Sequence, residues 1–346
     1  MAKQLNAQDA SLNLKHRFPY KWNLADGYPA KGVKKHGTTV MTTFACGGGS
    51  TMGYKLAGYD VVAANDIDPQ MGKVYKANHS PKQFFLCNIK DLLDRDDLPQ
   101  VEVLDGSPPC SVFSMAGSRE SAWQKDKMFR EGQAKQVLDD LFFDFIDLAE
   151  KMQPKIVIAE NVKGMLVGHA KWYTREVVRR FQKIGYKCQV FLLNAASMGV
   201  PQRRERVFFI AHKTNKHLEL AFNEPPIKFR EISLDYSDED MTPNEHSNWK
   251  KSKPGEAVGK FNTYKKLDMT RVANTIVASN PHYHPEQARR LNYAEETLIG
   301  SFPQDYNYLD LTPRYLIGMS VPPVMMAQVA TEVYNQLIAI NNESIT

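Results

Sequence analysis

The chain has 346 residues, a length that predicts two domains or one large domain with an insertion. With 42% hydrophobic and 24% charged residues it has the composition of a soluble globular protein, which argues against a disordered or fibrous chain. The sequence contains no run of about 18 apolar residues, so it predicts no membrane span. The formal net charge of +5 permits a polyanionic partner without requiring one.

Residues 1 to 38 are polar, basic and in places aromatic, and they lack the apolar segment of a secretory signal. We expect them to form an irregular N-terminal extension outside the core. The four cysteines are scattered and form no Cys-x-x-Cys pair, so the sequence favours neither a disulfide framework nor a zinc site, and we expect no metal. These features predict a cytoplasmic protein in a reducing compartment.

From residue 38 onward, short apolar strands alternate with helical patterns. Residues 38–69 predict a strand, a glycine-rich turn, a helix and a second strand, and residues 101–110 predict a strand that runs into a loop. The alternation continues with a helix at 139–154, a strand at 155–165, a helix at 172–186 and strands at 187–195 and 206–212. This pattern predicts an α/β fold with a doubly wound, mostly parallel sheet, which binds ligands at the carboxyl ends of its strands.

The pattern changes after about residue 213. Residues 231–245 carry six acidic residues and no lysine or arginine, whereas residues 250–266 carry six lysines and one acid. Proline, asparagine, serine and glycine are frequent here, which predicts a smaller, loop-rich unit with a charge-segregated surface. A helical pattern returns at 322–340.

Four glycines follow the first predicted strand in the stretch FACGGGSTMG, at positions 47, 48, 49 and 53. Without side chains they let the backbone approach a ligand closely. The next strand ends in NDID, and an acid there can accept hydrogen bonds from both hydroxyls of a ribose. The pattern indicates a nucleoside site, although an ordinary glycine-rich turn has the same composition.

Cys110 follows two prolines in the stretch SPPCS. A free thiol has a pKa of about 8.5, so a nucleophilic cysteine needs a nearby positive group or dipole. The prolines restrict the loop and reduce the entropy lost when the thiol is placed for attack. We interpret Cys110 as a nucleophile. The alternative is a buried, inert cysteine, an interpretation that we keep for Cys46, Cys87 and Cys188.

Two further motifs carry charged side chains at strand ends. Glu160 closes the apolar strand KIVIAE, where a carboxylate is costly unless it meets water or a partner, so it is a candidate acid. Arg204 and Arg206 stand two apart at the start of a strand, which places both guanidinium groups on one side and suits them to an anion or a carbonyl. A solvated strand end and a solvated strand edge are the plain alternatives.

The order of the motifs resembles that of the cytosine-5 DNA methyltransferase family of prokaryotes and phages. The matching stretches are FACGGGSTMG, SPPCSVFSMAG, ENVKGM, LNAASMGVPQRRERVFFI, ARRLNYAEETLIGSFP and GMSVPP, which span residues 42 to about 330. The resemblance implies a catalytic, cofactor-binding domain of residues 39–212 and 315–346. Residues 213–314 would form the target-recognition domain.

The resemblance implies S-adenosylmethionine as the cofactor, bound by a Rossmann-like domain. The residues that match the family's cofactor motifs are Phe44, Gly47, Gly48, Gly49, Asp66, Ile67, Asn88, Ile89 and Ser320. In this comparison Asp66 binds the ribose, Ile67 and Ile89 pack on the adenine, and Asn88 lies beside its amino group.

The resemblance also implies methyl transfer to C5 of a cytosine flipped out of double-stranded DNA. The Cys110 thiolate would add to C6, Glu160 would bind N3, Arg206 would hold O2, and Arg204 would be a second substrate-contacting arginine. Further DNA contacts are expected from Ser107, Pro109, Ser114, Gln202, Lys250, Lys251, Lys253 and Lys260. Lysine contacts to phosphate weaken with salt.

Six positions depart from the family pattern. Cys46 stands for glycine, Asp66 for the commoner glutamate, Asn88 for aspartate, Ser111 for glutamine and Met319 for asparagine, and a second proline, Pro108, precedes the nucleophile. Met319 matches a position near the methyl-donor end of the cofactor, so its change could loosen cofactor selectivity or slow turnover.

Two other functions stay open. A tRNA cytosine-5 methyltransferase is disfavoured by the long segment 213–270 and by the absence of a Cys-Phe-Thr tripeptide. An inactive, DNA-binding family member is disfavoured by the intact motifs. We expect a monomer associated with the nucleoid that acts in a restriction-modification system beside a separate endonuclease, or as an orphan enzyme.

Overall fold

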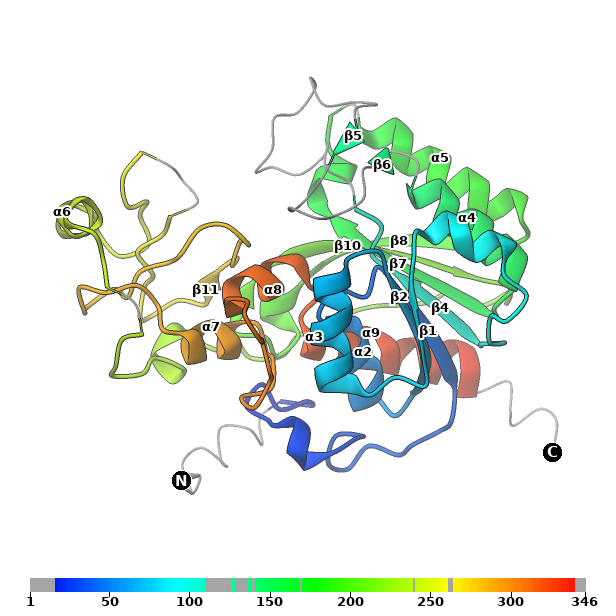
Figure 1. The fold of residues 1–346 in the computed structure, drawn as a ribbon, viewed down its shortest axis with the longest axis horizontal. Helices are drawn as coiled ribbons and strands as arrows, with labels where there is room; N and C mark the ends of the chain where they lie inside the picture. Colours follow the sequence, from blue (N-terminus) through cyan, green and yellow to red (C-terminus); the bar gives the residue numbers. More distant parts are fainter. Residues whose placement is uncertain are drawn as a thin grey trace.

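The computed structural model describes residues 16–109, 141–168, 170–238, 240–260 and 264–339, and the backbone of residues 126–127 and 136–137. Within these residues, seven strands form one sheet in the order β3-β2-β1-β4-β7-β10-β8 (Figure 1). The strands are β1 Thr39–Thr43, β2 Asp60–Asp66, β3 Gln83–Leu86, β4 Val103–Gly106, β7 Ile156–Val162, β8 Lys187–Asn194 and β10 Glu205–His212.

The sheet is mostly parallel. Strands β3, β2, β1, β4 and β7 run in one direction, and β10 is antiparallel to both β7 and β8. The chain winds from β1 outward to β2 and β3, and then returns to β4 on the other side of β1. A crevice forms at the carboxyl ends of the strands where the order reverses, and doubly wound folds bind ligands there. The predicted fold class is confirmed.

The helices alternate with the strands as the sequence predicts. They are α2 Gly49–Leu56, α3 Pro69–His79, α4 Leu141–Met152, α5 Ala170–Lys183, α6 Pro243–Lys251, α7 Tyr293–Ile299, α8 Pro313–Met319 and α9 Pro323–Val333. Short helical turns are η1 Leu24–Asp26, η2 Ile89–Asp94, η3 Lys163–Leu166, η4 Ala195–Ser197, η5 Phe229–Glu231 and η6 Tyr334–Ala339, and short strands are β5 Asp126–Lys127, β6 Gln136–Val137, β9 Gln202–Arg203 and β11 Ala273–Asn274.

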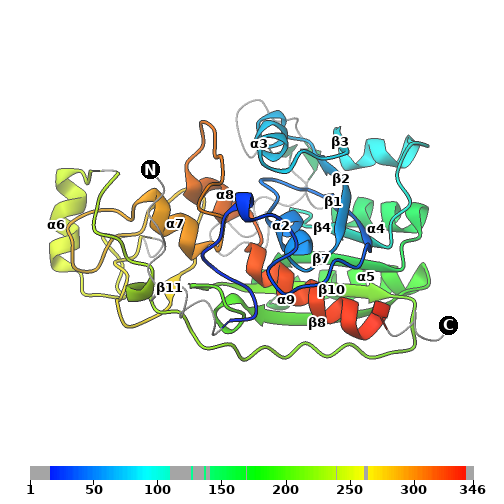
Figure 2. The ribbon, with the colours of Figure 1, turned by 90° about the horizontal axis from the view of Figure 1, so that it is seen from below.

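Helices cover both faces of the sheet (Figures 1 and 2). Alternate side chains of the strands point to opposite faces. Val103 of β4 packs in the cluster that contains α2 and α9, whereas its neighbour Leu104 packs in the cluster that contains α4 and α5. Because both faces are buried, the strands consist of nearly continuous apolar runs.

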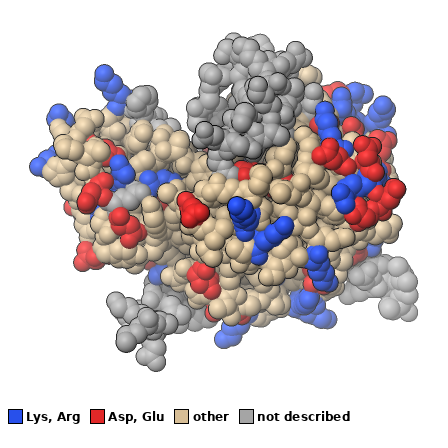
Figure 3. All heavy atoms as spheres, viewed as in Figure 1, with Lys and Arg blue, Asp and Glu red and all other residues tan. Residues whose placement is uncertain are grey.

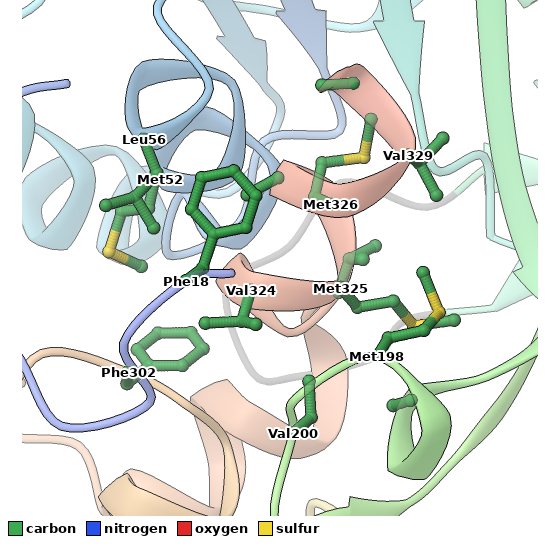
Figure 4. Packing of buried hydrophobic residues seen from close by; sticks show 14 of the residues in the cluster. Phe18, Met52, Leu56, Met198, Val200, Phe302, Val324, Met325, Met326 and Val329 are labelled. Carbon is green, nitrogen blue, oxygen red and sulfur yellow. The ribbon is translucent and has the colours of Figure 1, made fainter. Parts of the chain in front are cut away.

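The N-terminal segment contributes to the core, so the expectation that residues 1–38 lie outside it is wrong for the part described. Its backbone is irregular, as predicted, but Phe18, Tyr20 and Trp22 are each at most 4% exposed. Figure 4 shows Phe18 against side chains of α2 and α9. The Trp22 indole N–H also donates a hydrogen bond to the Ser301 carbonyl at 3.0 Å.

A smaller lobe of mostly irregular chain, with α6, α7 and β11, lies beside the sheet (Figure 1). A buried ion pair between Arg289 and Glu295, 2.8 Å apart, stabilises it. Residues 213–228 return along the larger domain instead: Leu218 and Ile227 belong to the main core (Figure 2). The larger domain therefore does not end at residue 213, as expected, because residues 213–228 still pack on its core.

The stretch Pro313–Ala339 is long and apolar enough to cross a membrane by length and composition alone. However, 78% of its most apolar window is buried inside the structure, as in the core helices of soluble proteins.

Candidate active site

Polar side chains lie on one face of the sheet, toward the carboxyl ends of the parallel strands β4 and β7 and at the start of the antiparallel strand β10. Asp105 of β4, Glu160 of β7 and Arg206 of β10 each stand two residues from an apolar side chain of the cluster that faces α2 and α9. They therefore project toward that same face. This row of charged groups beside the switch of strand order is the candidate active site.

The glycine-rich turn between β1 and α2 is packed tightly against other parts of the chain. A Cβ on Gly48, whose φ is 81°, would lie 2.1 Å from His79 Nε2. A Cβ on Gly49 would lie 2.2 Å from the Val321 carbonyl oxygen, and one on Gly47 would lie 2.7 Å from a methyl carbon of Leu316. The three glycines are thus required by contacts within the protein itself, in addition to any role toward a ligand.

Two side chains hold the carbonyl oxygen of Gly47. Tyr306 Oη donates to it at 2.5 Å, and His79 Nε2 donates at 3.1 Å. Burial lowers the pKa of His79 to about 3, so its ring is neutral and the proton lies on Nε2. His79 and Tyr306 fix the orientation of the turn, and no local sequence motif predicts them, because they reach it from α3 and from the chain before α8.

The Asp66 carboxylate is bound to this same turn. Its Oδ2 accepts a hydrogen bond from the Cys46 N–H at 2.8 Å, and its Oδ1 accepts one from the Asp68 N–H at 2.8 Å. Burial nevertheless raises the pKa of Asp66 to about 6. Cys46 has a positive φ of 47°, a conformation that favours glycine, and the bond to Asp66 helps to hold it there.

The three residues expected around an adenine differ in how much of their side chains is accessible to a ligand. Ile67 is partly exposed beyond the end of β2. Asn88 caps η2, since its Oδ1 accepts a hydrogen bond from the Lys90 N–H at 3.0 Å. Ile89 is only 2% exposed and packs in the core on the α4 side, so in this conformation it offers almost no surface to a ring.

A narrow hollow of about 10 Å³, close to the space that one water molecule needs, lies beside the turn. It is lined by Thr42, Thr43, Phe44, Ala45, Cys46, Gly49, Ser50, Thr51, Asp105, Ser107, Met319, Ser320 and Val321. The Ser320 hydroxyl is buried beside the Cys46 thiol and has no nitrogen or oxygen partner among the described residues. Met319 is 42% exposed. The expected cofactor residues Phe44, Gly49 and Ser320 therefore surround one hollow.

Glu160 and Arg206 form an ion pair. Arg206 Nε lies 2.9 Å from Glu160 Oε1, and the two side chains are 14% and 11% exposed. Burial lowers the pKa of Arg206, and the neighbouring Glu160 carboxylate opposes this shift. The structure thus brings together the two residues predicted to contact the cytosine ring.

Arg204 does not share this position, and its expected contact with the substrate stays a prediction. Its guanidinium donates hydrogen bonds to the carbonyls of Ile276 at 3.2 Å, Gly318 at 2.9 Å and Ser320 at 2.9 Å. The side chain is 2% exposed. Arg204 instead joins the sheet to the smaller lobe and to the segment that carries Ser320.

The expected contact of Gln202 with DNA is also at odds with its surroundings. Gln202 has no exposed surface. Its Nε2 donates to the Ile299 carbonyl at 3.2 Å, and its Oε1 accepts from the Ile276 N–H at 3.2 Å. Both polar ends of the amide are used inside the protein, so Gln202 links β9 to the smaller lobe.

Cys110 and Ser114 lie outside the described residues. The chain leading to Cys110 is described, and Ser107 and Pro109 are partly exposed there. Asn161 Nδ2 donates a hydrogen bond to the Pro108 carbonyl at 2.9 Å. The strand that carries Glu160 therefore holds the start of the Cys110 loop, a role that the sequence motif ENVKGM contains but does not reveal.

The four lysines predicted to contact DNA, Lys250, Lys251, Lys253 and Lys260, are all exposed at the end of α6 and just after it. Figure 3 shows basic side chains at the outer edge of the smaller lobe. Their exposure leaves them free to bind phosphate.

Comparisons with known proteins agree with the motif order. The family model "C-5 cytosine-specific DNA methylase" matches residues 38–254, which is more than half of the chain. The Type II methyltransferase M.FnuDI of Fusobacterium nucleatum is 31% identical over 197 residues, 57% of this chain and 53% of that protein, so the alignment covers about half of that relative. The Type II methyltransferase M1.HphI of Haemophilus parahaemolyticus is 27% identical over 332 residues, 85% of this chain and 86% of that protein.

A solved structure shares the fold. It is a protein encoded within a prophage of E. coli and described as a DNA modification methyltransferase, with a TM-score of 0.70 and 18% identity, over 87% of this chain and 99% of that one. The resemblance inferred from the motifs is confirmed by the match to the family model. This chain belongs to the C-5 cytosine-specific DNA methylase family.

Proposed function

We propose that the chain transfers a methyl group from S-adenosylmethionine to C5 of a flipped-out cytosine in a specific double-stranded DNA sequence, through a covalent bond between Cys110 and C6. The observation that carries this proposal is the largely buried pair of Glu160 and Arg206, 2.9 Å apart. Glu160 lies on β7, beside the strand that leads to Cys110, and Arg206 lies on β10, the next strand of the sheet.

The groups around the hollow beside the glycine-rich turn suit the cofactor. The Ser320 hydroxyl, which has no nitrogen or oxygen partner among the described residues, can donate a hydrogen bond into it, and the Asp66 carboxylate keeps lone-pair capacity beyond its bonds to backbone N–H groups. Asn88, expected beside the adenine amino group, uses its side-chain oxygen to cap η2. When bound, S-adenosylmethionine supplies an electrophilic methyl group.

The residues of this chain would activate the base. The Cys110 thiolate adds to C6 and turns the ring into an enamine, whose C5 is a better nucleophile than that of cytosine. Glu160 in its protonated form donates its proton to N3 in a hydrogen bond and so makes C6 more electrophilic, while Arg206 binds O2 and keeps Glu160 oriented. Loss of the C5 proton then expels Cys110. The base must leave the duplex stack, at a cost of a few kcal/mol, and phosphate contacts from the exposed lysines help to offset it.

Bisulfite sequencing of DNA from cells that express the protein tests the activity and its site together. We expect 5-methylcytosine in one short sequence, and none with Cys110→Ala. Methylation of RNA and not of DNA would favour a tRNA methyltransferase, and specific DNA binding without methylation would favour an inactive member.

An oligonucleotide with 5-fluorocytosine at that site tests the covalent step. The fluorine blocks the final elimination, so the active protein should form an adduct that survives denaturation. An active enzyme that forms no adduct would contradict the covalent mechanism. We further propose a monomer in the cytoplasm, associated with the nucleoid, and the similarity to Type II methyltransferases favours a restriction-modification role beside a separate endonuclease.

A further inference from the structure

Asp105 is a buried acid in the candidate cofactor hollow that none of the family motifs accounts for. It precedes the last residue of β4 and is 2% exposed. In the sheet it pairs with Thr42 of β1 and Ile158 of β7, so it lies at the centre of the sheet. Its side chain lines the hollow shared by Phe44 and Ser320.

The neighbours of Asp105 favour a carboxylate. Tyr54 Oη donates a hydrogen bond to Asp105 Oδ1 at 3.1 Å, and the Ser50 hydroxyl also hydrogen-bonds to the carboxyl group. Both come from α2. Two donors stabilise the ionised form, because a protonated acid needs an acceptor for its own hydrogen. The site is therefore arranged to hold a negative charge.

The described residues supply no positive charge to match it. The charged group that acts on Asp105 is the Glu160 carboxylate, which has the same sign. Burial, with a smaller contribution from Glu160, raises the pKa of Asp105 to about 8 against the effect of the Tyr54 and Ser50 hydrogen bonds. A carboxyl group that is prepared for ionisation but lacks a cation is a site for a cationic ligand.

We propose that Asp105 is the counter-ion for the positively charged methionine part of the cofactor, an inference that rests on the proposed function. A sulfonium or ammonium group in the hollow would complete the charge pair. Met319, on the opposite lining of the hollow, has no polar group that could do so.

The proposal predicts that binding is linked to a proton. At pH 7 a group with a pKa of about 8 is roughly one-tenth ionised, so binding of a cation would release a proton from Asp105. Of the other ionisable groups near the hollow, Tyr54, Tyr75 and Cys46 titrate above this range, since burial raises the pKa of Tyr75 and of Cys46 to about 12 and holds that of Tyr54 well above its usual 10. Glu160 and Asp66 are unchanged in all the variants below, and burial raises the pKa of Asp66 to about 6.

Calorimetric titration tests the inference without methyl transfer. S-adenosylmethionine and S-adenosylhomocysteine are titrated into the wild type, Asp105→Asn and Tyr54→Phe between pH 6 and 7.5, in two buffers of different ionisation enthalpy. We expect Asp105→Asn to weaken binding of S-adenosylmethionine about tenfold or more and to abolish the proton release. Tyr54→Phe removes a hydrogen bond that favours the Asp105 carboxylate, so the pKa of Asp105 should rise in this variant. Its affinity for S-adenosylmethionine should therefore reach the wild-type value only at higher pH.

The two ligands distinguish the two cations. If Asp105→Asn weakens only S-adenosylmethionine, the partner is the sulfonium, and if it weakens both, the partner is the ammonium. Wild-type affinity and proton release in Asp105→Asn would overturn the inference and leave Asp105 as a structural partner of Tyr54. A wild-type protein that binds neither compound would instead overturn the proposed cofactor itself.

Discussion

Arg206 Nε lies 2.9 Å from Glu160 Oε1, although the two residues are not opposite each other in the sheet. Glu160 pairs with Phe208 and Arg206 pairs with Val162, so the ion pair runs diagonally between β7 and β10. The Glu160 charge is therefore compensated before any base arrives, and its carboxylate is held at one angle.

Replacement of Arg206 by alanine should impair both stability and activity. It leaves Glu160 largely buried without its partner, which should lower the free energy of unfolding by about 3 kcal/mol. Methyl transfer in a single turnover should fall by at least about 100-fold, because O2 of the base loses its donor. Urea unfolding and a single-turnover assay measure the two effects. Arg206→Lys, the matched control, should retain most of the stability, and a wild-type rate in the alanine variant would contradict the role of Arg206.

Arg204 should behave differently, because its guanidinium binds three backbone carbonyls, one of them that of Ser320 beside the hollow. Arg204→Met keeps the length of the side chain and removes its three hydrogen bonds, so we expect a loss of about 2–4 kcal/mol in the free energy of unfolding. Cofactor affinity should also fall, since Ser320 loses its support. The single-turnover rate at saturating cofactor and DNA should stay within about threefold. A large loss of that rate with intact stability would support the substrate contact predicted from the sequence.

The contrast between these two arginines shows where sequence analysis succeeds. Glu160 and Arg206 are expected at the same cytosine ring because their motifs match those of the family, and apolar runs define the strands that carry them. The partners of Arg204 lie 72 to 116 residues away in the chain, and nothing in the motif reveals them. Spacing places a side chain on one side of a strand, but it does not say which elements pack there.

Two parts of the fold were missed for different reasons. Helix α3 does carry a local signal: Asp68 caps it by accepting a hydrogen bond from the Gln70 N–H at 2.8 Å, and Pro69 is its first residue. The N-terminal segment carries none. Its aromatic side chains are buried from an irregular backbone, so they show no helical or strand periodicity.

Phe18 tests the contribution of that segment. Phe18→Ala should lower the free energy of unfolding by about 3 kcal/mol, because the ring is fully buried against α2 and α9. Lys31→Ala, an exposed substitution in the same segment, should change it by less than about 0.5 kcal/mol. Chemical denaturation of the two variants measures the difference. Equal stability would show that the N-terminal segment does not pack on the core in solution.

His79 should make the fold sensitive to acid. Burial lowers its pKa in the folded protein to about 3, against about 6.5 when unfolded. Between these values the unfolded chain binds the proton and the folded protein does not. Stability contributed by the neutral ring is therefore complete above pH 6.5 and is lost as pH falls, by up to about 1.4 kcal/mol per pH unit.

The variant His79→Gln separates this effect from the other titrating groups. Its amide N–H can still donate to the Gly47 carbonyl, but it has no proton to gain. The free energy of unfolding, measured in urea from pH 4.5 to 6.5, should therefore depend on pH less steeply than in the wild type, by about one proton. His282→Gln is the matched control, because burial lowers the pKa of His282 to about 4. It should reduce the dependence of the free energy of unfolding on pH in the same way. Because His282 does not contact the described residues of the glycine-rich turn, the substitution should leave cofactor binding unchanged. Parallel curves for the wild type and His79→Gln would mean that His79 is charged in the folded protein, and the hydrogen bond that holds the glycine-rich turn would then join a cation to the Gly47 carbonyl.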